Sequence, residues 1–145
     1  MAVRYLPVRY LLDTNIASYA IKRSVPQVRV ALLSVPMSEV GVSVVTEAEL
    51  RFGVARRGAP AHLKLAVEEF LLRVEILPWD SQAAKHYAGL RSALENAGTP
   101  IANFDLMIAA HALAVGATLV THDRVFRRVK HLKVEDWTSA RGPSR

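Results

Sequence analysis

The sequence predicts an α/β fold of three layers, in which helices cover both faces of a mostly parallel central sheet of four to five strands. Short runs of β-branched and apolar residues alternate with longer helical patterns, and short polar turns join them. No shift in composition and no low-complexity segment divides the 145-residue chain. We therefore expect residues 1–137 to form a single domain, followed by a flexible C-terminal tail at residues 138–145.

Five apolar runs account for the strands of this sheet. Pro7 cannot donate a hydrogen bond to a sheet ladder, so the first strand is expected to begin after it, with residues 1–7 as a lead-in. The valine-rich run at residues 40–45 is typical of a buried strand. In order along the chain, the expected strands cover residues 8–12, 40–45, 74–77, 117–121 and 132–134.

Capping residues and helix breakers define the helices between these strands. Thr46 and Glu49 form the Thr-x-x-Glu pattern of a capping box, which predicts a helix that begins at Thr46. Asp80 or Ser81 is expected to cap the long helix after the third strand, and Asp105 is expected to open the last helix after a short linker. In order, the expected helices cover residues 16–22, 26–33, 46–57, 61–73, 81–96 and 105–115.

Composition limits the possible chemistry and partners. The chain has no cysteine, which excludes disulfides, thiolate zinc sites and cysteine nucleophiles. No N-terminal signal is visible and no run approaches the ~20 apolar residues of a membrane span, so we expect a soluble, cytoplasmic protein with no membrane contact. Lysine and arginine exceed aspartate and glutamate by 19 to 13, a formal charge of +6. This excess favours a nucleic-acid partner, although a solvated basic surface explains it equally well.

Four acids are expected at one edge of the sheet, because the residues that follow parallel strands gather there. Asp13 directly follows the first strand, and Asp123 lies just after the fourth. Glu49 lies one turn into the helix after the second strand, and Asp105 opens the helix that leads into the fourth. Taken singly, each acid is better explained as a helix cap. Taken together, four crowded carboxylates need a divalent cation, and all-oxygen ligands suit Mg²⁺ or Mn²⁺ rather than zinc.

Four segments of the chain resemble the motifs of a known family. They are Leu12-Asp13-Thr14-Asn15, Thr46-Glu47-Ala48-Glu49-Leu50, Asp105-Leu106-Met107-Ile108-Ala109-Ala110 and Val120-Thr121-His122-Asp123. Their order and spacing resemble the four motifs of PIN-domain ribonucleases, and most closely the VapC toxin family of bacterial toxin–antitoxin pairs. The resemblance covers nearly the whole chain, from about residue 9 to Trp137, and the four motifs as a set are specific.

The resemblance implies a PIN-like domain that acts as a Mg²⁺- or Mn²⁺-dependent endoribonuclease, hydrolysing RNA phosphodiesters as the toxin of such a pair. Loops of transfer or ribosomal RNA are the implied substrates. A cognate antitoxin protein that occludes the site is the implied partner. A homodimer is also implied, through the helices near residues 17–33 and 63–72, with a higher toxin–antitoxin assembly as a further possibility.

The resemblance assigns the catalytic acids by their places in the motifs: Asp13, Glu49, Asp105 and Asp123. Asp13 and Asp105 are the expected primary metal ligands, and the other two acids bind directly or through water. Only the motif match separates Glu49 from its neighbour Glu47.

Two further sets of side chains are expected around these acids. One set consists of hydroxyls and an amide that orient ligands or water, namely Thr14, Asn15, Ser43, Thr46 and Thr121. The other set consists of basic side chains that hold the RNA backbone, namely Arg9, Arg51, Arg124, Arg127, Arg128 and Lys130. For the last four of these, a solvated helix face is an equal alternative.

Two other classes of function stay open on the sequence. A phospho-receiver domain also ends its first strand in acids, and Asp80 follows a middle strand, but two acids follow the last strand where a receiver needs a lysine. A non-catalytic nucleic-acid-binding module explains the basic charge but leaves the four acids without a role. Among the remaining residues, His111 is expected to be a packed or half-buried residue of the last helix, and Trp79 and Trp137 are expected to anchor packing.

Overall fold

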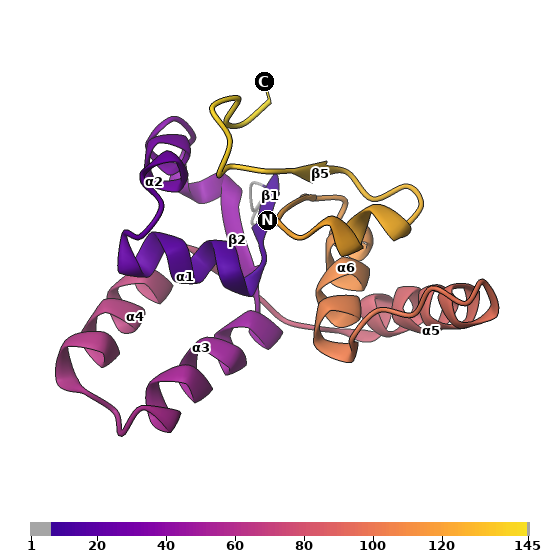
Figure 1. Ribbon diagram of the computed structural model, residues 1–145, viewed down its shortest axis with the longest axis horizontal. Helices are drawn as coiled ribbons and strands as arrows, with labels where there is room; N and C mark the ends of the chain where they lie inside the picture. Colours follow the sequence, from indigo (N-terminus) through magenta and orange to yellow (C-terminus); the bar gives the residue numbers. More distant parts are fainter. Residues whose placement is uncertain (1–6, 145) are drawn as a thin grey trace, which may run out of the picture.

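The computed structural model describes residues 7–144. Residues 1–6, which make up most of the predicted lead-in, and Arg145 lie outside this range. Figure 1 shows a central sheet with helices on both of its faces, as the sequence predicts.

Within residues 7–144, five parallel strands form one sheet in the order β3–β2–β1–β4–β5. Their bounds are β1 Tyr10–Leu12, β2 Val40–Ser43, β3 Glu75–Leu77, β4 Thr118–Val120 and β5 Val134–Glu135. Leu12 pairs with Val42 on one side and with Val120 on the other, so the three central strands end almost level. The polar residues that end or follow these strands therefore meet at one edge of the sheet.

Six α-helices within the same range cover the two faces of the sheet. Their bounds are α1 Thr14–Lys22, α2 Pro26–Leu33, α3 Val44–Arg56, α4 Ala61–Arg73, α5 Ser81–Asn96 and α6 Asn103–Val115, with 3-10 turns η1 at Met37–Glu39 and η2 at Arg124–Arg128. Helices α1 to α4 lie on one face, and α5 and α6 lie on the other (Figure 1). This arrangement confirms the predicted three-layer α/β/α fold.

Alternate residues of β1 contact the two helical layers, as the period of two in a strand requires. Tyr10 and Leu12 pack with the core formed by α1 to α4, whereas Leu11 packs with the core formed by α5 and α6. Trp137 is fully buried and its ring meets the Tyr10 ring edge-on at 5.1 Å between centroids. The expected packing role of Trp137 is confirmed. Trp79 donates from Nε1 to the Met107 carbonyl at 3.0 Å, which anchors the loop after β3 to α6.

The predicted capping box at Thr46 is wrong, because Ser43 caps α3 instead. The Ser43 Oγ accepts a hydrogen bond from the Val45 amide at 3.1 Å, so Val44 and Val45 form the first helical turn and not the end of the strand. Thr46 is the third residue of the helix and is buried. A short run of valines can form either a strand or a buried helical turn, and its length does not distinguish the two. For this reason the sequence prediction places the start of α3 two residues too late.

Other element boundaries differ from the sequence prediction by one or two residues. Helix α6 begins at Asn103, before the expected start at Asp105, because the Leu106 amide already donates to the Ala102 carbonyl at 2.9 Å. Asp105 is therefore the third residue of the helix and still lies in its first turn. The last strand covers Val134–Glu135 rather than residues 132–134.

The chain end contacts side chains of β1 and β5. The Tyr10 hydroxyl donates to the Ser144 carbonyl at 2.7 Å, and the Ser144 amide donates to Glu135 at 3.0 Å. Flexibility of residues 138–145 stays a prediction. No helix in the described part of the chain is both long and apolar enough to cross a bilayer.

Candidate active site

The carboxyl edge of the sheet contains a topological switch point between β1 and β4. The chain proceeds from β1 to β2 and β3 on one side, and it later forms β4 and β5 on the other. Open α/β sheets bind ligands in the crevice beyond such a point. Asp13 follows β1 and Thr121 follows β4, so these two residues border the crevice.

Asp13 is almost fully buried, with 4% of its surface exposed. Its Oδ1 accepts a hydrogen bond from the Ile16 amide at 2.8 Å, which caps α1 and fixes the carboxylate. Burial raises the pKa of Asp13 from 3.8 to about 6. Hydrogen bonds from the Thr121 hydroxyl and the Ile16 amide oppose this shift, while the charges of Asp105 and Asp123 add to it. The capping role and the site role of Asp13 are therefore compatible.

Asp105 and Asp123 approach Asp13 from α6 and from the turn after β4. Burial raises the pKa of Asp105, and the charges of Asp123 and Glu49 raise it further. Asp123 is exposed, and its Oδ1 accepts from the Val125 amide at 2.9 Å to cap η2. The electrostatic coupling indicates that all four predicted acids share one region of the molecule.

Glu49 is held by a hydroxyl from another helix. The Thr14 Oγ1 donates to Glu49 Oε1 at 2.7 Å and lies 3.2 Å from the Thr46 Oγ1. A hydroxyl has one proton, so the Thr46 hydroxyl donates to Thr14 while Thr14 donates to Glu49. Glu47 instead pairs with Arg51 at 2.9 Å on the other side of α3. The contacts thus distinguish the two glutamates that only the motif match separated, and they rule out the capping-box role for Glu49.

Ser43 and His111 form a buried pair behind these acids. The His111 Nδ1 lies 2.8 Å from the Ser43 Oγ, and both side chains are buried. The Ser43 Oγ also accepts from the Val45 amide, so this hydroxyl bridges the first turn of α3 and the His111 ring. Burial lowers the pKa of His111, against the opposing effects of Asp80 and the Pro78 carbonyl. The expected packed role of His111 is confirmed, and the contact links α6 to the start of α3.

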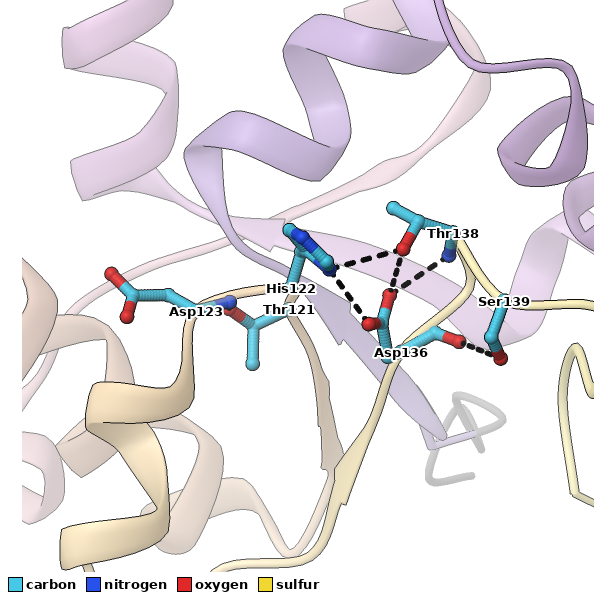
Figure 2. Close-up of polar contacts among 6 residues, drawn as sticks. All are labelled: Thr121, His122, Asp123, Asp136, Thr138 and Ser139. Atoms are coloured by element: carbon cyan, nitrogen blue, oxygen red, sulfur yellow. Dashed lines mark hydrogen bonds and ion pairs between the residues drawn. The ribbon is translucent and has the colours of Figure 1, made fainter.

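A polar cluster that the sequence patterns do not reveal lies next to Asp123. The His122 Nδ1 lies 2.8 Å from Asp136 Oδ2, and the Thr138 hydroxyl donates to Asp136 Oδ1 at 2.6 Å (Figure 2). Burial raises the pKa of Asp136, but hydrogen bonds from Thr138 and His122 outweigh it and lower the pKa below its ordinary value. The Asp123 carboxylate points away from this cluster (Figure 2). The cluster fixes the turn that carries Asp123 to the segment after β5.

The predicted RNA-binding cations fall in different places. Arg9 precedes β1, so it lies at the amino edge of the sheet, opposite the acids, and donates to the Ser144 carbonyl at 3.2 Å. Arg51 is engaged by Glu47 and Glu68. The remaining four residues lie in or directly after η2, following Asp123, and all are exposed: Arg124, Arg127, Arg128 and Lys130.

The donor set fits a hard divalent ion that keeps much of its hydration. Within residues 7–144, no three histidine, aspartate or glutamate side chains lie close enough to surround one ion. Mg²⁺ is commonly held through one or two carboxylates, with waters completing its octahedron. The available groups at this edge are carboxylate and hydroxyl oxygens, and the raised pKa of Asp13 reflects in part the crowded acids that a cation would neutralise.

Comparisons with known proteins agree with this geometry. The sequence matches the PIN domain family over residues 10–132. The chain is 35% identical to the tRNA(fMet)-specific endonuclease VapC of Salmonella typhimurium over 131 residues. This alignment covers 90% of the present chain and 98% of the relative. It is 36% identical to ribonuclease VapC2 of Rickettsia felis over 130 residues, and this alignment covers 88% of the present chain and 97% of the relative.

Solved structures show the same fold. The structure of DNA-bound VapBC from Salmonella typhimurium matches with a TM-score of 0.84 at 35% identity, over 90% of this chain and 98% of that one. VapBC2 from Rickettsia felis, bound to a promoter DNA fragment, matches with a TM-score of 0.83 at 35% identity, over 88% and 98%. The chain therefore belongs to the PIN-domain family and, within it, to the VapC ribonucleases.

Proposed function

We propose that this VapC-family endoribonuclease hydrolyses RNA phosphodiesters with one or two Mg²⁺ or Mn²⁺ ions held at the carboxyl edge of its sheet. The crowding of acids at the switch point supports this proposal most directly. Neighbouring carboxylates add to the raised pKa of both Asp13 and Asp105. A divalent cation would remove this repulsion.

Each acid has a distinct place in the proposed reaction. Asp13 and Asp105 are the primary ligands, while Glu49 and Asp123 bind directly or through water. When bound, the ion supplies a polarised phosphoryl oxygen and an attacking water of lowered pKa. The Ile16 amide and the Thr121 hydroxyl keep Asp13 in one orientation, so the carboxylate needs no conformational search before it binds an ion.

The hydroxyls around the acids orient them. Thr14 directs one oxygen of Glu49 and leaves the other free, and Thr121 acts on Asp13 from the end of β4. Asn15 is exposed and borders the same hollow as Thr14 and Glu49, where an amide can bind substrate or water. Such supporting residues commonly contribute 10–100-fold, that is about 1–3 kcal/mol, to activity or metal affinity.

Transfer RNA is the substrate class that we propose, with loops of ribosomal RNA as the second choice. A relative that is 35% identical over 90% of this chain is named for cleaving tRNA(fMet). The formal charge of +6 favours a polyanionic substrate. The exposed basic residues that follow Asp123 are placed to hold the backbone on the β4 side of the acids.

The proposed partners are a cognate antitoxin and a second copy of the chain, in the cytoplasm. The similar structures described above are VapBC complexes, which supports an antitoxin for this chain. Exposed apolar side chains lie on both helices where the resemblance placed a dimer contact, with Leu33 on α2 at 76% and Leu72 on α4 at 85% exposure. Side chains this exposed favour burial in an assembly.

The test is cleavage of total bacterial tRNA and of ribosomal RNA by the purified chain, with Mg²⁺ and with EDTA. We expect discrete tRNA fragments with Mg²⁺ and none with EDTA. An Asp13→Asn variant purified in parallel serves as the control, because asparagine preserves the cap on α1 but removes the charge. Equal cleavage by that variant would identify a contaminating nuclease and reject the assignment.

A further inference from the structure

A hollow of about 160 Å³ begins at Glu49, one of the four acids, and runs between α1 and the α3–α4 pair. Thr14, Asn15 and Glu49 line its end nearest the crevice. Helices α1, α3 and α4 lie side by side on one face of the sheet (Figure 1). The hollow is therefore a continuation of the proposed catalytic centre and not a separate cavity.

The far end of the hollow is basic. Lys22, at the end of α1, and Arg56 and Arg57, at the end of α3, line it there. Lys22 and Arg57 also border the next hollow along the surface, of about 430 Å³, so they stand at the junction of a longer groove. Among the salt bridges within residues 7–144, none involves these three cations. Arg56 lies over the Phe52 ring at 5.8 Å from its centroid, a contact that does not neutralise its charge. The positive charge of all three residues is therefore available to a ligand.

Helix geometry sets the spacing between the acids and these cations. Arg56 follows Glu49 by seven residues on α3, which is about 10 Å along the helix axis at 1.5 Å per residue. Lys22 follows Thr14 by eight residues on α1, which is about 12 Å by the same rise. A nucleotide strand with one phosphate at the acids would bring another phosphate to the cations within a few nucleotides.

We propose that this groove binds the single-stranded RNA that flanks the scissile phosphate, with Lys22, Arg56 and Arg57 holding a phosphate a few nucleotides from the cleavage site. The proposal rests on the endoribonuclease function above and adds a path for its substrate. An extended strand fits a groove that combines an apolar floor, here Leu50, with a basic rim. None of the basic residues singled out from the sequence belongs to this groove.

Gly53 lies in the groove wall one turn after Glu49 and gives a means of blocking the path. A Cβ added at Gly53 would meet nothing within 4 Å, so packing does not require a glycine there. Gly89 on α5 is also in mid-helix with open space around it, and it does not line the groove. The two glycines form a matched pair for substitution by a large residue.

An acidic protein segment is the competing occupant, and two features favour RNA. The groove shares Thr14 and Glu49 with the catalytic centre, which any substrate strand must enter. The basic end contains three cations, two adjacent at the end of α3 and one at the end of α1, which suit a repeating charge better than one carboxylate. The test below gives opposite results for the two occupants.

The first measurement is binding of a labelled 12-nucleotide single-stranded RNA at several salt concentrations, in an Asp13→Asn background that prevents cleavage. Neutralising the basic end with Lys22→Gln and Arg57→Gln should weaken binding about tenfold. The slope of log Kd against log salt should fall by about 0.7 for each phosphate that the variant no longer neutralises. Arg29→Gln, an exposed arginine on α2, removes the same type of charge outside the groove and should leave both values within error of the background.

The second measurement is steady-state cleavage of tRNA by otherwise intact chains. Gly53→Leu and the double Lys22→Gln, Arg57→Gln variant should raise KM about tenfold with little change in kcat, because the acids are untouched. Gly89→Leu should behave as wild type. Unfolding of Gly53→Leu would be detected by its melting temperature, and the charge variants still test the groove in that case.

Unchanged RNA affinity, salt slope and KM in all groove variants would overturn the proposal. If the same variants then lose binding of a polyglutamate peptide, the groove serves an acidic protein segment. If the proposed endoribonuclease function itself is wrong, the wild-type chain will cleave no RNA. The binding measurement does not depend on cleavage and still tests the groove in that case.

Discussion

The Thr14 hydroxyl donates a 2.7 Å hydrogen bond to Glu49 and so joins the first turn of α1 to the second turn of α3 across 35 residues of sequence. Thr14 directly follows Asp13, so the same turn that fixes one acid also orients another. The bond is charge-assisted, which makes it stronger than a bond between neutral groups. The positions of two proposed catalytic acids, Asp13 and Glu49, are therefore coupled through one residue.

Replacing Thr14 by valine tests this coupling. Valine keeps the β-branched shape but removes the hydroxyl, so Glu49 loses its partner while α1 remains folded. We expect kcat/KM for tRNA to fall by about 10–100-fold, the range found for groups that orient metal ligands. Thr14→Ser keeps the hydroxyl and should retain most of the activity. Equal rates for Thr14→Val and wild type would show that Glu49 needs no support from α1.

The buried charge of Asp13 predicts a specific dependence of stability on pH. The folded chain holds the proton of Asp13 more tightly than the unfolded chain, because its pKa is about 6 instead of 3.8. Protonated Asp13 therefore stabilises the folded state at about pH 4 and below, and this stabilisation is lost as the pH rises through about 6. The ionised form then costs up to about 3 kcal/mol at neutral pH, from 1.36 kcal/mol per pKa unit.

An Asp13→Asn variant removes this cost without removing the helix cap. In the absence of divalent ions, it should melt about 5–10 °C above wild type at about pH 7 and close to wild type at about pH 4. Differential scanning calorimetry at both pH values measures the difference in melting temperature between variant and wild type. Other groups such as His111 titrate in both proteins, so their effect cancels to first order in this difference. A variant that is less stable than wild type at neutral pH would contradict the raised pKa.

Added Mg²⁺ should stabilise the wild-type chain and not the variant. A ligand at 100 times its Kd stabilises the folded state by about 2.7 kcal/mol, which is a shift of about 5–10 °C for a chain of this size. The expected shift is lost in Asp13→Asn and reduced in Asp105→Asn. Glu69→Gln, on the exposed face of α4, should respond to Mg²⁺ as wild type does. An equal shift in all four proteins would place the ion elsewhere.

Ser43→Ala is expected to destabilise the fold more than an ordinary surface substitution. It removes the cap on α3 and leaves the buried His111 Nδ1 without its hydroxyl partner. The two losses together should cost about 2–4 kcal/mol in urea denaturation, from about 1 for the cap and about 1–3 for the unpaired group. Ser92→Ala on the exposed face of α5 should change stability by less than about 0.5 kcal/mol. Similar values for both variants would mean that the Ser43–His111 contact contributes little.

The sequence was sufficient to predict the sheet and the position of Asp13. Apolar strands alternating with helices determine a parallel order, and a parallel order brings strand ends together whatever the loops do. The same logic applies to Arg9, which precedes β1 and therefore lies at the amino edge, away from the acids. The strand assignment alone is thus enough to separate Arg9 from the proposed RNA site.

Other features depend on how helices pack against one another and so were not accessible to local patterns. Glu47 and Glu49 are two residues apart on α3 and point to different sides, but only the packing of α1 decides which side faces Asp13. Lys22 and Arg57 are likewise distant in the sequence and meet only across the α1–α3 groove. The predicted start of α3 is wrong because valine suits both a strand end and a buried helical turn.

The rate of tRNA cleavage as a function of Mg²⁺ concentration tests the central claim most directly, that acids from separate elements jointly hold a divalent ion that cleaves RNA. Wild type should be inactive in EDTA and rise to saturation with Mg²⁺, and Glu69→Gln should follow the same curve. Asp105→Asn should be slower by at least about 100-fold, since it removes a direct ligand and not merely a supporting group, and it should need more Mg²⁺. Cleavage that survives EDTA, or an Asp105→Asn curve that coincides with wild type, would contradict the account.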